Sequence, residues 1–323
     1  MAATRNRLSA NLIERVGAFL APRLGPSERL TVGLSGGCDS VVLLHLLTQL
    51  GYTGRLDAIH VHHGLSPNAD AWAQFCADCC ARLTIPLSIR RVAVDRSSGL
   101  GLEAAARAAR YEIFTEAASD CLLLAHHRGD QAETVLFNLL RGAGVTGAAG
   151  MPAERAFGSR RLLRPLLHCS RADLETYASD AGLSWVDDES NADTALTRNF
   201  LRHKALATLG QRFPTAEASL AQAASNFGEA ATLLDDLARL DWQRVGDNEA
   251  ARLSELKVLT LPRLKNLLRF RLRHLGWQVP VASRLDEFAR QLLDAGPDRH
   301  PELSLPGGKM RVARGLLHWL PEK

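Results

Sequence analysis

The stretch RLTVGLSGGCDSVVLLHLLTQL, residues 29–50, decides the fold of the first half of the chain. It opens on the short apolar and β-branched run RLTVGL, turns through SGGCDS, and continues as an apolar segment from Val41 to Leu50. This order predicts a strand, a glycine turn and a buried helix. In doubly wound sheets, ligands bind at such a turn, beyond the carboxyl end of a strand.

Strand and helix patterns keep alternating after residue 50. The expected strands lie at 56–61, 87–94 and 120–125, and the expected helices at 71–83, 103–118 and 130–140. Such alternation predicts a parallel sheet with helices on both faces. We therefore expect an α/β domain with a doubly wound parallel sheet over residues 1–214.

The organisation changes after Gly150. We expect an arginine-rich loop and short extended segment at 151–170, a helix at 171–181, and an irregular polar stretch at 187–199. Alanine and leucine spacing then predicts one long helix from Thr215 to Leu240, followed by further helices and a final short β element at 309–319. Residues 215–323 are thus predicted to form a smaller, mainly helical domain behind a long linker helix.

Composition sets the class of protein. A chain of 323 residues that is 46% hydrophobic and 23% charged can bury a core, and its length suggests about two domains. We find neither an apolar run long enough for a membrane span nor a signal peptide behind Arg5 and Arg7, so we expect a cytoplasmic protein without a membrane partner. The six cysteines are expected to be reduced thiols, and the net charge of +4 is carried largely by arginine, which favours phosphate contacts.

The SGGCDS turn has the chemistry of a phosphate loop. Gly36 and Gly37 let the backbone approach an anion closely, and the hydroxyls of Ser35 and Ser40 add donors. The lysine of a Walker A loop is missing. Asp39 would repel a phosphate unless a divalent cation lay between them, so we assign it to Mg²⁺. The structural alternative is an ordinary left-handed turn with Asp39 as a helix-cap residue.

The segment HHRGDQAET, residues 126–134, follows the expected strand at 120–125 and enters a helix. Asp130 and Glu133 share one face of its first turn, which suits them to hold a cation or an ammonium group. Placed there, both would also complement the helix dipole. We interpret His126 and His127 as structural, because no further ligand stands at metal-binding spacing.

Two basic helices leave their interpretation open. Glu103, Arg107 and Arg110 share one helical face, either as a solvated ion-pair stripe or with the arginines directed toward phosphates opposite Asp39. In the C-terminal half, Arg269 and Arg273 belong to a helix that mixes basic residues with leucines. Its basic face is either simply solvated or binds the phosphates of a nucleic acid.

Six ordered blocks resemble the PP-loop ATP pyrophosphatases and, more closely, the tRNA(Ile)-lysidine synthetases. The matching blocks cover most of residues 29–202: SGGCDS at 35–40, AIHVHHGLSPNADAW at 58–72, GLEAAARAARY at 101–111, AHHRGDQAET at 125–134 with LLRGAGVTGAAGM at 139–151, RPLL at 164–167, and DESNADTALTRNFLR at 188–202.

The resemblance implies that ATP adenylates the C2 oxygen of the wobble cytidine in the CAU anticodon of a tRNA(Ile), and that free L-lysine then displaces AMP to give lysidine. Its implied residues fall into four groups. The ATP-binding residues are Ser35, Gly36, Gly37, Cys38, Asp39, Ser40, Val61 and His62. The catalytic residues are Asp39, Asp130, Glu133 and Arg110, and the Mg²⁺ ligands are Asp39 and Asp130. The candidates for tRNA or phosphate contacts are Arg107, Arg198, Arg202, Arg269 and Arg273. The C-terminal domain is then expected to bind tRNA.

The chain departs from the family pattern at two positions. Gly129 stands where members commonly have a first acidic residue before Asp130, and Glu189 stands where many have proline. Compared with longer members, a second C-terminal tRNA-binding domain is expected to be absent. The sequence leaves the oligomeric state open, a homodimer included.

Three other functions compete with this interpretation. Cys76 and Cys79 form a CxxC that a PP-loop tRNA thiolation enzyme could use, although the four-residue spacing of Cys76 and Cys80 in an apolar helix favours structural cysteines. A catalytically silent tRNA-binding protein is favoured only by Gly129. Small-molecule amidation is disfavoured by the long basic C-terminal half and by the lack of a recognisable glutaminase segment.

Overall fold

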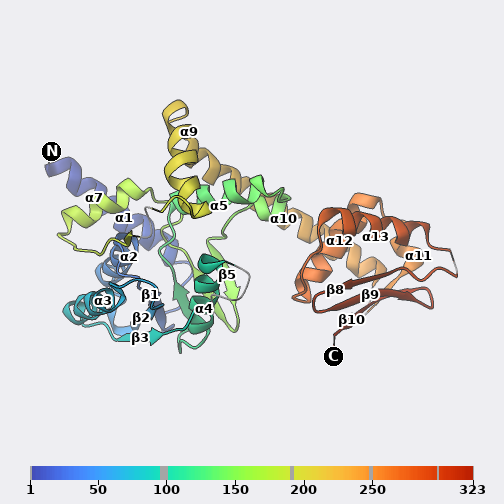
Figure 1. Cartoon of the computed structure of the whole chain (residues 1–323), viewed down its shortest axis with the longest axis horizontal. Helices are drawn as coiled ribbons and strands as arrows, with labels where there is room; N and C mark the ends of the chain where they lie inside the picture. The colour runs from blue at the N-terminus through green and yellow to red at the C-terminus, as the bar shows by residue number, and fades with distance from the viewer. Residues whose placement is uncertain (1, 95–100, 190–192, 247–249, 297, 323) are drawn as a thin grey trace. The chain divides into compact units, whose positions relative to one another are not determined.

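The computed structural model describes residues 2–94, 101–189, 193–246, 250–296 and 298–322, without the side chains of 2–10, 102 and 103 (Figure 1). The chain divides into two compact units, Met1–Gly228 and Glu229–Lys323. Their boundary lies inside the long helix α10 (Ala216–Val245), whereas the sequence placed the division just before this helix.

The N-terminal unit is built on a six-stranded sheet. Its strand order is β3 (Leu87–Arg91), β2 (Leu56–His62), β1 (Leu30–Gly33), β4 (Cys121–Leu123), β6 (Arg160–Leu163) and β5 (Glu154–Phe157). Neighbouring strands are parallel except β5, which pairs antiparallel with β6. Because the order runs outward from β1 in both directions, β1 and β4 flank the switch point at which a ligand crevice opens. The predicted doubly wound fold is confirmed.

The hairpin of β5 and β6 replaces the loop and short extended segment that we expected at 151–170. Phe157 pairs with Arg160 across a two-residue turn, and Gly158 supplies its positive φ of 61°. The arginines of this segment hid the strand pattern, since only Leu162 and Leu163 of β6 are buried.

Both faces of the sheet are covered, so its central strands β1, β2 and β4 are buried along almost their whole length. On one face, Leu30, Val32 and Leu123 pack in a core that includes α1 (Ala2–Leu20), α2 (Cys38–Gln49) and α7 (Arg171–Asp180). On the other face, Leu122 and Leu162 pack against Phe114 of α4 (Leu102–Thr115).

The N-terminal unit contains further helical segments besides α1, α2, α4, α7 and the start of α10. They are the 3₁₀ turn Thr53–Arg55, α3 (Ala69–Leu83), α5 (Arg128–Leu140) and α6 (Val145–Ala148), followed by α8 (Thr197–Phe200), the π-helical segment η3 (Leu201–Leu206) and α9 (Ala207–Arg212). The helix that begins at Thr197 starts inside the stretch we expected to be irregular, 187–199, of which residues 190–192 lie outside the described part of the chain.

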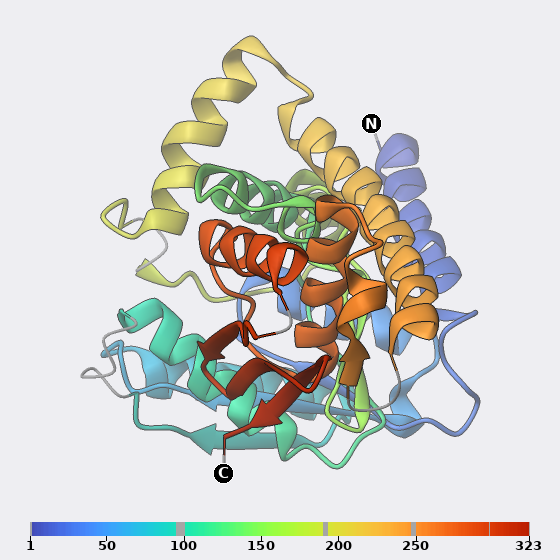
Figure 2. The same cartoon turned by 90° about the vertical axis from the view of Figure 1, so that its right-hand side faces the viewer.

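The C-terminal unit contains the end of α10, three shorter helices and a small antiparallel sheet. The helices are α11 (Leu253–Leu256), α12 (Leu261–His274) and α13 (Ala282–Asp294); the strand order is β7 (Ala250–Arg252), β10 (Leu316–Pro321), β9 (Gly308–Ala313) and β8 (Glu302–Leu305) (Figure 2). Leu264, Leu268 and Phe288 lie in its core. This unit thus has a four-stranded sheet where we expected a single short β element.

No helix in the described part of the chain is both long and apolar enough to cross a bilayer.

Candidate active site

A cavity of about 670 Å³ opens where β1, β2 and β4 end, at the switch point of the sheet. Its lining comes from the loops after these three strands and from α4, and it includes Ser35, Asp39, Ser40, Val61, His62, His63, Arg107, Arg110, Tyr111, His126 and Asp130. The volume lies within the range of about 300–1,000 Å³ typical of small-molecule sites. Residues that are far apart in the sequence, and that we singled out separately, therefore meet in one place.

The Ser35–Ser40 loop forms the floor of this cavity. Gly36 has a φ of +90°, and a Cβ there would lie 2.9 Å from Cγ2 of Val186 and 3.2 Å from Sγ of Cys76, so only glycine fits. The Ser40 hydroxyl donates to the Gly37 carbonyl at 2.9 Å and accepts from the Ser35 N–H at 3.2 Å. These bonds hold the loop in a fixed shape.

Helix α2 begins directly after this loop. Its N-cap residue, Gly37, offers no side-chain cap within the described structure, which leaves first-turn N–H groups for an anion. The Cys38 side chain points into the core, and burial raises the pKa of its thiol to about 11, against a smaller opposing effect of Arg171. Cys38 can therefore contribute backbone but not thiolate chemistry to the loop.

Asp39, in the first turn of α2, is held by an arginine that the sequence did not reveal. The Arg171 guanidinium donates from one nitrogen to both carboxylate oxygens of Asp39, at 2.9 and 2.7 Å. Arg171 starts α7 behind the Ser170 cap, and no motif marks it. Burial raises the pKa of Asp39 above its usual value, although His127 and Arg171 oppose the shift.

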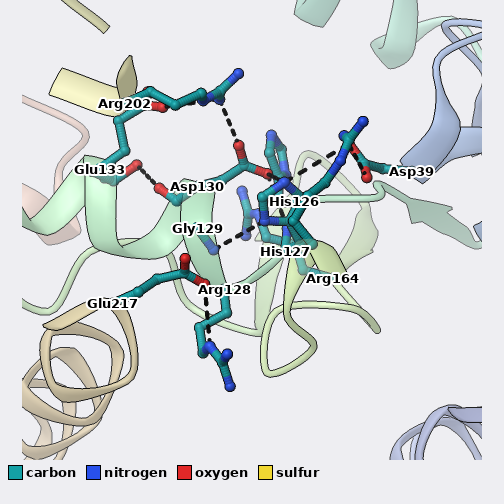
Figure 3. A network of polar contacts seen from close by, with 12 residues as sticks. Asp39, His126, His127, Arg128, Gly129, Asp130, Glu133, Arg164, Arg202 and Glu217 are labelled. Carbon is teal, nitrogen blue, oxygen red and sulfur yellow. Dashed lines mark hydrogen bonds and ion pairs between the residues drawn. The ribbon is translucent and has the colours of Figure 1, made fainter. Parts of the chain in front are cut away.

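His127 joins Asp39 to Asp130 (Figure 3). As the N-cap of α5, His127 accepts a hydrogen bond from the Gly129 N–H on its ring atom Nδ1 at 2.9 Å. The backbone N–H of His127 donates to Asp130 Oδ2 at 2.9 Å. With Nδ1 accepting, the ring proton is assigned to Nε2. That nitrogen lies 3.8 Å from Asp39 Oδ2 and 3.7 Å from Asp130 Oδ2, so the two carboxylates converge on one point.

Asp130 and Glu133 share an arginine. Arg202 donates to Asp130 Oδ1 at 3.0 Å and to Glu133 Oε2 at 3.1 Å, and Arg198 lies 3.4 Å from Glu133 Oε1. Burial is the largest single influence on both carboxyls and favours a higher pKa. At Asp130 the combined effect of His127, His126 and Arg202 outweighs burial, so its pKa is lowered. At Glu133 burial outweighs the arginines, so its pKa is raised. Arg198 and Arg202, our candidates for tRNA or phosphate contacts, thus lie on the site's carboxylates.

Further cations and histidines complete the wall of the cavity. Arg107 and Arg110 reach it from α4, and a buried residue of the RPLL block, Arg164, donates from Nε to Nδ1 of His126 at 3.2 Å. Burial lowers the pKa of His126, and the charge of Asp130 opposes this shift. Sequence reasoning quoted Arg164 only as part of a block and gave it no role.

The end of β2 supplies the opposite wall. Val61 and His62 lie there as expected, and His62 Nε2 lies 3.1 Å from Asp70 Oδ1. His63, which the sequence did not single out, also lines the cavity; burial, followed by the Arg110 charge, lowers its pKa to about 4. Its Nδ1 is buried without a hydrogen-bond partner among the described residues, so it is available to a ligand.

The donor set suits Mg²⁺ only together with a ligand. Among the described residues no three His, Cys, Asp or Glu side chains gather in a metal-binding group. Asp39 and Asp130 provide one carboxylate each on converging sides. Mg²⁺ is usually bound by one or two carboxylates, with phosphate oxygens and water completing its shell, and the pair fits that pattern.

Comparisons with known proteins agree with this geometry. Residues 8–209 match the model of a PP-loop domain, and residues 252–318 match that of the TilS substrate binding domain. The tRNA(Ile)-lysidine synthase of Nitrosomonas europaea is 44% identical over 94% of this chain and 67% of its own length, and that of Azoarcus sp. is 47% identical over 90% and 66%. The chain belongs to the tRNA(Ile)-lysidine synthase family.

The chain spans about two thirds of the length of these tRNA(Ile)-lysidine synthases. The one from Pseudomonas fluorescens is 43% identical over 97% of this chain and 72% of its own. A U34-tRNA thiolase, NcsA from Methanococcus maripaludis with its [4Fe-4S] cluster, is similar in structure, with a TM-score of 0.60 over 69% of this chain and 80% of that one. At 18% identity this likeness shows the fold alone.

The CxxC cysteines are packing residues in this member of the lysidine synthase family. Cys76 and Cys79 are buried on α3, and Cys76 Sγ lies below the phosphate loop, 3.4 Å from His60 Nδ1. Burial raises the pKa of both thiols, that of Cys76 to about 12. Together with the relatives' names, this argues against the thiolation alternative.

The basic residues of α12, within the part that matches the TilS substrate binding domain, are mostly engaged inside the C-terminal unit. Arg273 forms an ion pair with Asp235, and Lys265 donates to Asp286 at 2.6 Å. Arg271 is buried with its guanidinium 3.8 Å from the Trp242 ring centre. Arg269 is half-buried. The helix therefore offers less free positive charge than its sequence suggests.

Proposed function

We propose that this chain uses ATP to attach L-lysine to C2 of the wobble cytidine in the CAU anticodon of tRNA(Ile), giving lysidine, AMP and pyrophosphate. The observation that carries the proposal is the convergence of the Ser35–Ser40 loop, Asp39 and Asp130 in one cavity, in a chain of the lysidine synthase family. The loop suits a pyrophosphate and the carboxylates suit a metal or an ammonium group.

In the first step, the C2 oxygen of the cytidine attacks the α-phosphorus of ATP. The bond from this phosphorus to the bridging oxygen breaks, and pyrophosphate leaves with the electron pair. The N–H groups that begin α2 would hold the pyrophosphate, and Arg107 and Arg110 would offset the developing charge. Val61, His62 and the unpartnered Nδ1 of His63 would bound the adenosine.

In the second step, an amino group of lysine attacks C2 and loses a proton, and AMP leaves with the electrons of its bond to C2. Asp130 and Glu133 would bind the ammonium end of lysine. Glu133 Oε1 accepts no hydrogen bond in the described structure, and the nearest cation, on Arg198, is 3.4 Å away, so this oxygen can take a donor.

Mg²⁺ would be held by Asp39 and Asp130 together with phosphate oxygens, and it would supply charge neutralisation at the phosphates. For this, Asp39 must exchange its contact with Arg171, whose side chain is 41% exposed and has a second carboxylate partner in Glu175. The C-terminal unit would help to bind the tRNA, and a cytoplasmic location and a homodimer remain predictions.

Incorporation of labelled lysine tests the proposal. The chain is incubated with ATP, Mg²⁺ and a tRNA(Ile) transcript that carries a CAU anticodon, beside a transcript whose wobble cytidine is replaced. We expect lysine on the first transcript only, with one AMP released per lysine. Binding of tRNA without AMP release would instead identify a silent binding protein, and tRNA-dependent AMP release without lysine attachment would contradict the lysine step.

A further inference from the structure

Residues 197–213, TRNFLRHKALATLGQRF, form a basic arm that the proposed reaction does not fully use. The arm consists of α8, η3 and α9 with Phe213 directly after them, and it carries Arg198, Arg202, Lys204 and Arg212 without any aspartate or glutamate. Both views show this helical segment projecting from the N-terminal unit (Figures 1 and 2). Arg198 and Arg202 are paired with Glu133 and Asp130, so the charge left to attract a polyanion lies on the exposed Lys204 and Arg212.

Two large aromatic rings lie exposed on the arm. Phe200 is 49% exposed and Phe213 is 57% exposed. Each has a cation nearby: Lys204 follows Phe200 by four residues and so shares its helical face, and the Arg212 guanidinium lies 5.7 Å from the centre of the Phe213 ring. Exposed aromatic rings beside cations are the usual features of a surface that binds single-stranded nucleic acid.

The arm is tied to the candidate active site by its other side. Arg198 and Arg202 flank Phe200 in the sequence, and both contact the buried carboxylate of Glu133. Leu201, next to Phe200, is buried, which fixes the orientation of this turn. The helical turn that contains the exposed Phe200 therefore also contains the two arginines that contact Glu133.

We propose that the basic arm binds the anticodon loop of the tRNA substrate, with Phe200 stacking on the base beside the wobble cytidine and Lys204 contacting its phosphate. The inference rests on the proposed function, because only a loop whose wobble base enters the cavity brings the neighbouring base to Phe200. Phe213 lies roughly 20 Å further along the helix, at about 1.5 Å per residue, and so serves a more distant nucleotide with Arg212.

The test uses the whole chain and a tRNA(Ile) transcript in which 2-aminopurine replaces the anticodon adenine, the base next to the wobble cytidine. Phe200→Leu removes the aromatic face and Phe200→Trp keeps it, while Lys204→Gln removes one charge. Ile89→Ala and Arg90→Gln, on the edge strand β3, are matched controls for lost apolar and basic surface. Affinity, 2-aminopurine fluorescence and the salt dependence of binding are measured for each.

We expect the native chain to quench 2-aminopurine through stacking. Phe200→Leu should weaken binding about tenfold and remove the quench, and Phe200→Trp should restore both. Lys204→Gln should lower the slope of log affinity against log salt by about 0.7 to 0.9. The control variants should behave like the native chain.

Unchanged affinity and quench in Phe200→Leu would overturn the proposal. Weaker binding with an unchanged quench would also overturn it, since the ring would then act through the fold and not by stacking on the base. Lysine incorporation by the native chain is measured separately: if it fails while the Phe200-dependent quench is present, the proposed function is wrong and the arm's RNA contact stands.

Discussion

The exposed guanidinium of Arg202 lies 2.9 Å from Oε2 of the buried Glu133. Glu133 is 1% exposed, whereas the Arg202 side chain is 41% exposed, so a solvent-accessible cation compensates a carboxylate that has almost no contact with water. Arg202 also reaches Asp130. The two carboxylates that would bind the ammonium of lysine therefore share Arg202 as a counter-charge, with Arg198 as a second cation near Glu133.

Arg202→Gln should move the acid limb of lysine incorporation to higher pH. Arg202 lowers the pKa of Asp130 and of Glu133, so its loss lets both carboxyls stay protonated at higher pH, and protonated carboxyls cannot bind an ammonium group. Activity at about pH 6 should fall roughly tenfold relative to that at about pH 8. Single-turnover incorporation at saturating ATP measures this, with Arg90→Gln as the control. An acid limb identical to that of the native chain would disprove the dependence.

The contact of Asp39 with Arg171 predicts opposite effects for two substitutions. Asp39→Asn should reduce tRNA-dependent AMP release at least about a hundredfold, because it removes a Mg²⁺ ligand. Arg171→Gln should lower the Mg²⁺ concentration needed for half-maximal AMP release several-fold, since Arg171 competes with the ion for the same oxygens. Glu175→Gln is the matched control, because it removes the other carboxylate partner of Arg171. If neither Asp39→Asn nor Arg171→Gln changes the Mg²⁺ dependence, Asp39 is not a metal ligand.

Replacing the cysteines of the CxxC should affect the fold and not the chemistry. Cys76→Ser puts a hydroxyl into the core beneath the phosphate loop, and we expect a loss of roughly 1 to 3 kcal/mol in the free energy of unfolding. Lysine incorporation per folded molecule should stay within about twofold of the native value for Cys76→Ser and Cys79→Ser. Thermal unfolding and iron analysis accompany the assay. Iron bound in proportion to the protein, lost in either variant, would revive thiolation.

The sequence predicted the architecture of the N-terminal unit because its central strands are buried on both faces. DCLLLA has no polar residue after Asp120, and two glycines mark the turn after RLTVGL. The strands of the C-terminal sheet were harder to predict from the sequence. Glu302–Leu305 alternates exposed and buried residues over only four positions, too short a pattern to separate from a loop.

The acidic residues that the structure brings together were named from the sequence, and so were part of the basic ones, but Arg171 was missed and Arg164 was given no role. Asp39, Asp130 and Glu133 stand in recognisable loops at the starts of helices. Arg171 and Arg164 come from segments that the parallel sheet brings to the same edge, and no local pattern reports such a long-range contact. Arg202 was named, but its contacts depend on a helical segment that begins at Thr197, inside the stretch expected to be irregular.

Gly129 has a local steric reason that its sequence context hides. A Cβ at this position would lie 2.8 Å from Cε1 and 3.1 Å from Nδ1 of His127, because the imidazole folds back over the backbone to accept the Gly129 N–H. A side chain at 129 would therefore push away the ring whose Nε2 faces both Asp39 and Asp130.

Gly129→Ala should for this reason lower the free energy of unfolding by about 1 kcal/mol, the usual value of a lost N-cap, and reduce AMP release about tenfold. His127→Ala should show similar losses, and the double variant should lose little more than either alone, since both changes remove the same contact. Gly228→Ala, a helical glycine with open space around its Cβ position, is the control and should be neutral or stabilising. Additive losses in the double variant would show that Gly129 acts independently of His127.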